Sequence, residues 1–456
     1  MVLATMDPVR LPPAPPIPKL LQGVGFLSPD TSLAKMARRY GPAFTLNLPI
    51  FDRVVVLSDP DLIQQLLTAG DDVVGLAGVF GEIFGPGSTF SLHGPPHRAR
   101  RKLLAPPFHG KTVRSHEVII EEEVLRETAS WPEGRQFKTL PSMLRITLNA
   151  ILRAVFGAEG EALGELRELL PPMMRLGVRI AMVPCARRDI GAWSPGAKLI
   201  RQRAHYDALV RRLIADVRND PDLDRRTDVL SLMLRARYDD GTVISVDHIA
   251  DELLTLLAVG HETTGTALSW AVERLRRQPQ LLDRLTAEAD AGGSELRQAS
   301  IAEVLRTRPV ITTTSRRVLR RIRLGEWVIP EGYRVVSGIS LVHDSERCFP
   351  DAAAFNPDRF VGSAPDTHIW IPYGGGIRRC IGAAFANMEL DVTLRTLLNE
   401  FKFVATHAAG ERSHFTGVAT APAGGGRAVV YRRATRPTGK TADHQWISQR
   451  DADVPC

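Results

Sequence analysis

The chain of 456 residues has few cysteines, and they stand far apart, at Cys185, Cys348, Cys380 and Cys456. So few and so scattered cysteines exclude a disulfide framework and fit a reducing compartment. The cysteine–histidine spacing of a zinc site and the glycine fingerprint of a dinucleotide-binding turn are both missing. No run of 18 apolar residues occurs. The sequence therefore predicts no transmembrane anchor.

The two ends of the chain also lack apolar runs. The first ten residues have no apolar core of the signal-peptide kind, and a proline-rich stretch follows at 11–18. The last 25 residues, 432–456, are polar, and we expect them to be disordered. We predict a proline-rich segment at 1–18, one large domain at 19–431 and a disordered tail at 432–456. The expected location is the cytoplasm, with peripheral contact at a membrane left open.

One stretch near the C-terminus carries chemistry. Residues 373–382, YGGGIRRCIG, place Cys380 between a glycine-rich turn and an amphipathic helix pattern. Backbone N–H groups of the turn and the positive end of the helix dipole both favour a thiolate. A thiolate binds iron, and a thiolate-ligated haem favours cleavage of the O–O bond. A buried structural cysteine is the alternative, but the glycines and the arginine two residues before favour the ligand.

This stretch resembles the haem-binding loop of the cytochrome P-450 superfamily, F-x-x-G-x-R-x-C-x-G, with Tyr373 in place of the phenylalanine. The resemblance implies haem b with an axial thiolate from Cys380. It also implies a mainly α fold with small β-sheets, a single large domain that holds the haem between a long central helix and the cysteine loop. A buried Tyr373 would need a partner for its hydroxyl and could alter hydrogen bonding around the sulfur.

The long central helix is predicted over residues 245–277, which are mostly apolar and contain no proline. At its centre stands VGHETT, residues 259–264. A threonine hydroxyl there can bond a carbonyl of the preceding turn and open the helix locally. Glu262 and Thr263 resemble the proton-delivery pair of the family, although a surface Glu beside a Thr is common. Val259 stands where the family usually has Ala or Gly, and this would narrow the distal pocket or shift the opened turn.

A charged pair, Glu303 and Arg306, is predicted to have a structural role. Glu303 and Arg306 lie three residues apart and can pair on one helix face, which alone is a common surface feature. Residues 355–360, FNPDRF, resemble the family's meander, so Arg359 would complete a buried cluster with that pair. The cluster would brace the proximal side of the haem.

Haem carries two propionates, which need cations or hydrogen-bond donors. After two prolines a helix can place His97 and Arg101 on one face. Both are similar to the family's propionate contacts, as are Arg378 and, at a suitable offset, Arg316. The remaining basic residues of this run, 98, 100 and 102, are predicted to form a solvated face.

The rest of the chain predicts mainly helices over 110–300 and two strand pairs, 43–48 with 53–57 and 326–330 with 333–336. The glycine-rich stretch 73–92 resembles the family's substrate-facing loop. With residues 253–258 and 310–314 it would line an apolar pocket.

The function implied by the resemblance is a monooxygenase that inserts one atom of O2 into an apolar small-molecule substrate (lipid, fatty acid, sterol or terpene-like). No flavin or iron–sulfur motif is present, so electrons are expected from a separate ferredoxin and ferredoxin reductase. The net charge of +7 suits an acidic ferredoxin, docked on Arg98, Arg100, Lys102 and Arg379 near the thiolate.

Other functions remain open. A haem-thiolate peroxygenase or isomerase would bypass the ferredoxin, and a haem-dependent sensor or ligand carrier would form no product. Nucleic-acid binding would fit the basic pI, but no recognition motif accompanies it, so no nucleic-acid partner is expected.

Overall fold

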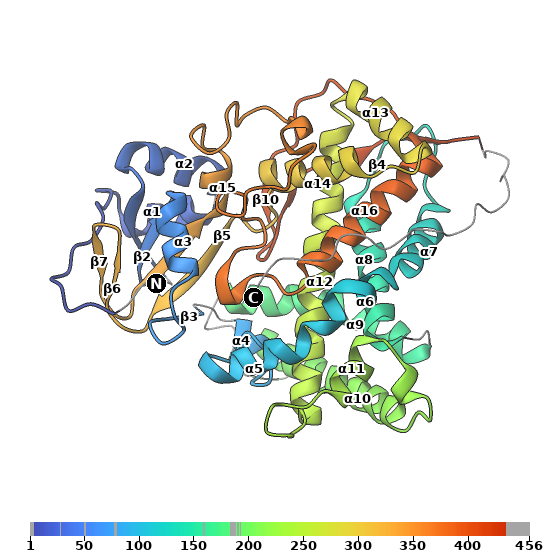
Figure 1. Cartoon of the computed structure of the whole chain (residues 1–456), viewed down its shortest axis with the longest axis horizontal. Helices are drawn as coiled ribbons and strands as arrows, with labels where there is room; N and C mark the ends of the chain where they lie inside the picture. Colours follow the sequence, from blue (N-terminus) through green and yellow to red (C-terminus); the bar gives the residue numbers. More distant parts are fainter. Residues whose placement is uncertain are drawn as a thin grey trace.

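The computed structural model describes residues 4–434, except 28, 50–51, 77–79, 158–159, 183–187, 189–190 and 192. Helices form most of it, and a small sheet region lies at one side (Figure 1). The predicted disordered tail falls largely on residues 435–456, which lie outside the described part.

The helices begin and end as follows: α1 Lys19–Leu27, α2 Pro29–Tyr40, α3 Pro60–Leu67, α4 Phe80–Phe84, α5 Gly94–Leu104, α6 Gly110–Arg114, α7 Glu117–Thr128, α8 Leu140–Phe156, α9 Glu161–Met182, α10 Pro195–Arg218, α11 Val229–Arg235, α12 Val246–Leu275, α13 Pro279–Asp290, α14 Glu295–Thr307, α15 Ile339–His343 and α16 Ala383–Glu400. The strands are β1 Ala43–Leu48, β2 Asp52–Leu57, β3 Val74–Leu76, β4 Phe137–Lys138, β5 Thr313–Val318, β6 Ile322–Leu324, β7 Trp327–Ile329, β8 Arg334–Gly338, β9 Phe401–Phe403, β10 Ser413–Phe415, β11 Thr420–Pro422, β12 Arg427–Ala428 and β13 Val430–Arg432.

Helix α12 is the central element, and its bounds agree with the predicted helix. It begins because the hydroxyl of Ser245 caps the backbone N–H of His248. Its first half packs into one core cluster, with Leu253 and Leu257 fully buried, and its second half packs into another, around Leu268. The motif at 259–264 lies between the two cores, where Val259, Gly260, Glu262 and Thr263 are only half-buried and the other two residues are buried.

The main sheet has the strand order β1-β2-β8-β5-β3. The predicted pairing of 43–48 with 53–57 is confirmed, since β1 and β2 run antiparallel from Ala43 opposite Leu57. The predicted pairing of 326–330 with 333–336 is wrong. Strand β7 instead pairs with β6, and β8 inserts between β2 and β5. A sequence pattern shows that a strand exists, but tertiary contacts select its partner.

The proline-rich N-terminal segment lies along this sheet region. Residues Ala4 and Arg10 form bridges with Ile322 and Val328 of β6 and β7. The carbonyl of Pro13 accepts the N–H of Thr45. The first residues of the described chain are therefore fixed to the sheet by backbone hydrogen bonds.

Candidate active site

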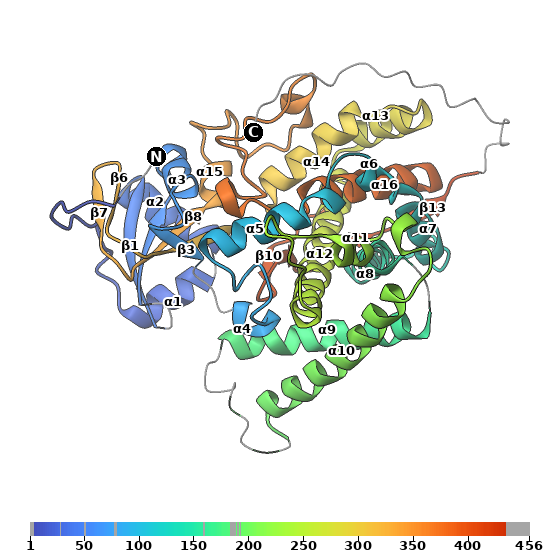
Figure 2. The same cartoon turned by 60° about the horizontal axis from the view of Figure 1, so that its bottom comes forward.

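The cysteine loop is shaped by its glycines. A short 3-10 turn, Gly376–Arg378, precedes Cys380, whose backbone N–H bonds the carbonyl of Tyr373 at 2.9 Å. Gly376 has φ +61°, and a Cβ there would overlap the carbonyl oxygen of Leu67. Only glycine satisfies both the left-handed backbone and this close approach. Helix α16 begins three residues after the cysteine, as the pattern predicts, and lies beside α12 in both views (Figures 1 and 2).

The protein environment alone does not favour the thiolate of Cys380. The side chain is exposed, but the surrounding protein removes enough water that desolvation raises the pKa of the thiol above its usual value. The backbone N–H of Gly382 and the charges of Arg101 and Arg379 act in the opposite direction and are weaker. The backbone N–H of the turn thus acts in the predicted direction but does not offset desolvation, and the contribution of the helix dipole stays a prediction. A metal cation beside the sulfur would supply the missing charge.

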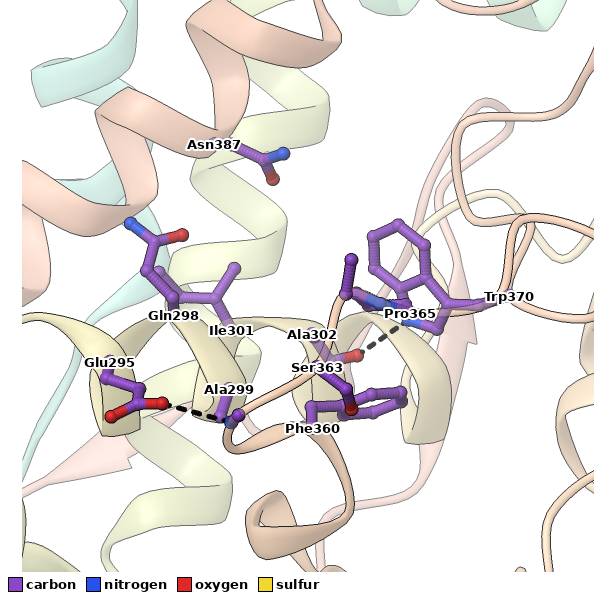
Figure 3. A pocket seen from close by; sticks show the side chains of 12 residues that line it. Glu295, Gln298, Ala299, Ile301, Ala302, Phe360, Ser363, Pro365, Trp370 and Asn387 are labelled. Carbon is purple, nitrogen blue, oxygen red and sulfur yellow. Dashed lines mark hydrogen bonds between the residues drawn. The ribbon is translucent and has the colours of Figure 1, made fainter. Parts of the chain in front are cut away.

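The hydroxyl of Tyr373 has a hydrogen-bond partner of its own on α16. It donates to Oδ1 of Asn387 on α16 at 2.6 Å, and the ring packs edge-on against Trp370. Asn387 also lines a hollow of about 450 Å³ between α14 and residues 360–370 (Figure 3). Sequence reasoning missed Asn387. The signal available was the requirement for a partner to the buried hydroxyl.

Four predicted propionate contacts, His97, Arg101, Arg316 and Arg378, lie close enough together to influence one another electrostatically. Desolvation, followed by the charges of Arg316 and Arg101, lowers the pKa of Arg378 to about 10. Desolvation also lowers the pKa of Arg316 to about 10 and, with Arg378 and Arg101, that of His97 to about 3. The buried Nδ1 of His97 has no hydrogen-bond partner in the described residues. Arg316 is buried and Arg101 and Arg378 are half-buried. Cations that repel one another, beside an unused nitrogen, fit a group that carries two carboxylates.

Arg378 and Arg101 also connect this cluster to its surroundings. The Arg378 guanidinium donates to the carbonyls of Thr89 and Leu92, at 2.8 and 2.6 Å, which ties the loop before α5 to the cysteine turn. Arg101 interacts electrostatically with Cys380. The cationic cluster and the sulfur therefore belong to one site.

The motif on α12 differs from the prediction in one respect. The hydroxyls of Thr263 and Thr264 bond the carbonyls of Val259 and Gly260, at 2.7 and 3.1 Å. The helix nevertheless continues through these residues, so the predicted local opening is not present. Both hydroxyls bond carbonyls that keep their place in the helix, and this leaves the backbone ladder closed. Glu262 makes its hydrogen bond elsewhere, with Oε1 accepting from Thr416 at 2.9 Å.

Glu303, Arg306 and Arg359 lie together. Glu303 and Arg306 are both fully buried, with two N–H···O contacts of 2.7 and 2.8 Å. Arg359, on the turn Pro357–Phe360, approaches the same carboxylate at 3.3 Å from a partly exposed position. The bracing role stays a prediction.

The predicted solvated basic face needs correction. Arg100 is 2% exposed, because it pairs with Glu252 of α12 at 3.3 Å and donates to the carbonyl of Gly87 and the hydroxyl of Tyr238. Arg98 and Lys102 are exposed but pair with Asp71 and Asp239. Much of the expected positive charge is thus neutralised, which weakens a docking patch built on this run.

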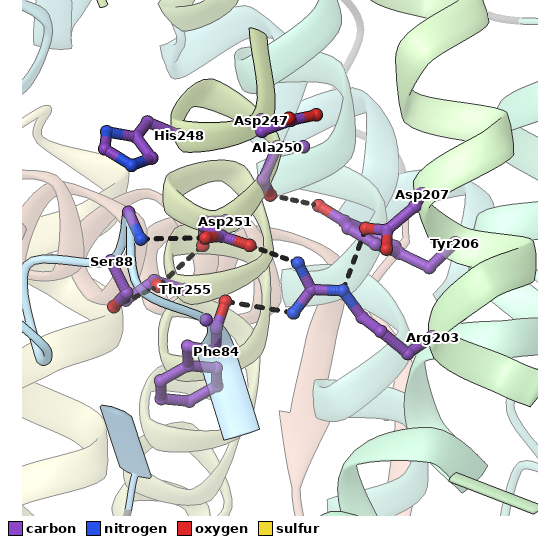
Figure 4. Close-up of polar contacts among 12 residues, drawn as sticks. Phe84, Ser88, Arg203, Tyr206, Asp207, Asp247, His248, Ala250, Asp251 and Thr255 are labelled. Atoms are coloured by element: carbon purple, nitrogen blue, oxygen red, sulfur yellow. Dashed lines mark hydrogen bonds and ion pairs between the residues drawn. The ribbon is translucent and has the colours of Figure 1, made fainter. Parts of the chain in front are cut away.

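Two adjacent acids of α12 were also missed. Glu252 accepts from the backbone and hydroxyl of Thr89, and desolvation raises its pKa to about 7. Asp251 accepts from the N–H of Gly87 and pairs with Arg203 of α10, which also bonds the carbonyls at the end of α4 (Figure 4). Carboxylates inside an apolar helix run were the signal, because such groups are rarely buried without partners. They fix the loop 83–92 against α12.

A largely apolar cavity of about 500 Å³ lies between α9, α10 and α12, with Arg203 and Asp207 of α10 as its charged lining. It includes Ile83 from the predicted substrate-facing loop and Leu254 from the predicted helix face. Met173, Met174 and Leu199 add flexible apolar lining. The predicted stretch 310–314 does not border this cavity.

A sequence model of the family described as cytochrome P450 matches residues 11–425. This chain belongs to the cytochrome P450 family. A relative named putative cytochrome P450 138, from Mycobacterium tuberculosis and Mycobacterium bovis, is 54% identical over 428 residues, covering 93% of this chain and 97% of the relative. Putative cytochrome P450 135B1 of Mycobacterium tuberculosis is 37% identical over 446 residues, 95% of this chain and 93% of the relative.

A solved structure, that of retinoic acid bound cyanobacterial CYP120A1, matches with a TM-score of 0.82 and 22% identity, over 93% of this chain and all of that one. The P450 fold predicted from the cysteine loop is thereby confirmed, as is the single domain. Membership makes the protein a haem-thiolate monooxygenase that uses O2, an apolar substrate and a redox partner. Among the described residues, no helix is long and apolar enough to cross a membrane.

Proposed function

We propose that this P450 binds haem b through Cys380 and hydroxylates an apolar substrate of the lipid, fatty acid, sterol or terpene kind with electrons from a ferredoxin. The observation that supports the cofactor site most is the cluster of Arg101, Arg316 and Arg378 with the unpartnered nitrogen of His97. These four side chains would hold the propionates, and Cys380 the iron.

When bound, the haem would supply the activation of O2, and the chain's own residues would bind, orient and provide protons. Thr263 would hold a proton at Oγ1, which now bonds the carbonyl of Val259. Glu262 would take protons from solvent. We expect Thr263→Ala to keep haem and substrate binding but to divert electrons to peroxide. Coupled product formation in that variant would remove Thr263 from the relay.

The apolar cavity beside α12 supports the substrate class. Most of its lining is aliphatic and thioether side chains, with the ion pair of Arg203 and Asp207 among them, and it is large enough for an extended hydrocarbon. Retinoic acid, to which the structural neighbour is bound, has a chain of this kind. A series of fatty acids and a series of terpenoids can be compared by the shift of the haem spectrum upon binding, and the affinities would rank these two substrate classes.

A ferredoxin partner is supported by the net charge of +7 and by Arg379, which is exposed one residue before the ligand cysteine. We expect the first electron transfer to slow as salt rises, since screening weakens steering of an acidic partner. Arg379→Gln should lower this rate more than Arg10→Gln, a matched change of an exposed arginine on the sheet region. Equal rates in both variants would place the ferredoxin elsewhere.

The first test is the spectrum of the reduced protein with carbon monoxide. A Soret band at the red-shifted thiolate position is expected for the wild type and for Cys348→Ser, and its loss is expected for Cys380→Ser. A thiolate band in Cys380→Ser would overturn the assignment. Product formed only with peroxide would favour the peroxygenase alternative, and tight binding without product would favour a carrier or sensor.

A further inference from the structure

The turn between strands β10 and β11 meets the acid of the proton-delivery motif. Thr416, in this turn, donates its hydroxyl to Oε1 of Glu262 at 2.9 Å, although the two residues are 154 positions apart in sequence. The hydroxyl also accepts the backbone N–H of Ala419 at 3.2 Å. The carbonyl of Ala419, at 3.0 Å, is a second acceptor for the hydroxyl proton, which is therefore shared between this carbonyl and Glu262. Figures 1 and 2 both show β10 beside the middle of α12.

The turn is held firmly in place. Gly417 has φ +107°, and a side chain there would overlap Val178 of α9. Ala419 is fully buried, and Thr420 bonds both the carbonyl of Val310 and the indole N–H of Trp270 on α12. Because the turn is held by these contacts, the hydroxyl of Thr416 keeps one position relative to α12. Thr416 is exposed and Glu262 half-buried, so the contact between them lies at the protein surface.

The two members of the motif do not bond each other in the described structure. The Thr263 hydroxyl is occupied by the carbonyl of Val259, whereas the Glu262 carboxylate is turned toward Thr416. A half-buried carboxylate with one directed bond has one preferred orientation, and losing that bond frees its side-chain torsions.

We propose that Thr416 is a positioning residue, which holds the Glu262 carboxylate at the protein surface so that protons from solvent enter the distal site there. This rests on the proposed monooxygenase function. Reduction of O2 to peroxide consumes two electrons and two protons, and reduction to two waters consumes four of each. The peroxide-to-water ratio therefore reports proton supply even when no substrate is oxidised.

The test compares Thr416→Val, which removes the hydroxyl, with Thr416→Ser, which keeps it. A hydrogen bond to a charged group is worth about a tenfold change in an equilibrium, so Thr416→Val should raise the peroxide-to-water ratio by up to about tenfold. Thr416→Ser should restore it. Thr242→Val, which removes an exposed hydroxyl bonded to Asp240, is the matched control and should leave the ratio unchanged.

A double-mutant cycle separates positioning from simple turn stability. In the Glu262→Gln background, Thr416→Val should have little further effect on the ratio, because the carboxylate it positions is gone. An undiminished effect in that background, or an unchanged ratio in Thr416→Val, would overturn the proposal. A second readout needs no turnover. Thermal unfolding of the wild type, the two single variants and the double variant should show coupling between residues 262 and 416. Absence of this coupling would also refute the contact. If the wild type forms no product, that result counts against the proposed function instead. It is obtained before any variant is compared, so the two failures can be told apart.

Discussion

Replacing Arg306 by alanine should destabilise the protein more than any change of a surface ion pair. All five guanidinium N–H donors are used. Their acceptors are the carboxylate of Glu303 and the carbonyls of His343, Ala352 and Ala354, at 2.7–2.9 Å. Both charged side chains are fully buried. The substitution therefore leaves a buried carboxylate without its main partner and three carbonyls with lost donors.

Removing one partner of such a pair costs about 3–5 kcal/mol. Domains are typically stable by about 5–15 kcal/mol, so the substitution removes a large part of the stability, and we expect a lower yield of folded, haem-containing protein at 37 °C. Arg359→Ala should cost less, because its side chain is partly exposed and its contact to Glu303 is longer, at 3.3 Å. Arg306→Lys keeps the charge but loses the two-pronged geometry and should lie between.

The measurement is urea unfolding at pH 7 together with the haem content of the purified protein. Arg323→Ala is the control: it breaks a pair with Asp7 at 2.7 Å, in which both side chains are about half exposed, and should cost less than about 1 kcal/mol. If Arg306→Ala unfolded within about 1 kcal/mol of the wild type and kept its haem, the buried cluster would not brace the fold.

Buried polar groups give three further predictions. The imidazole of His343 accepts the N–H of Ile371 and so must donate to the carbonyl of residue 306; burial lowers its pKa to about 3, so folding favours the neutral ring. The contribution of the neutral ring to the free energy of unfolding is complete above pH 6.5 and is lost as pH falls, by about 2 kcal/mol at pH 5. In urea unfolding, the stability of His343→Gln should therefore fall less steeply with decreasing pH than that of the wild type. An identical slope would contradict this. Tyr373→Phe should keep the thiolate Soret position, because the hydroxyl bonds Asn387, and a shifted band would show that it acts on the sulfur. Arg100→Leu should not slow catalysis directly, but it should raise the pKa of Glu252 further. The variant should therefore lose stability relative to the wild type as pH rises above 7, by up to about 1.4 kcal/mol per pH unit. Equal pH profiles of unfolding for variant and wild type would refute this.

The sequence predicted local structure well where it depends on neighbouring residues. The glycine turn around Cys380 and the bounds of α12 follow from backbone conformation and helix capping over a few positions. Partners far apart in sequence were not predictable in this way. The pairing of β8 with β2 and the burial of Arg100 both depend on elements that only the folded chain brings together. The basic run around Arg100 resembled a solvated face, since a lone sequence pattern carries no information about a carboxylate 152 positions away.

The same long-range contacts explain why the candidate site is a collective property of the fold. Thr89 is held from two sides, its N–H and hydroxyl by Glu252 and its carbonyl by Arg378. The first anchor belongs to the central helix and the second to the cysteine turn. A cation that would bind a propionate is thus oriented by a loop, and that loop is fixed by a buried carboxylate on the opposite side of it. Because Arg100 balances this carboxylate, a residue that is not among the predicted propionate contacts helps to determine how rigidly the candidate site is built.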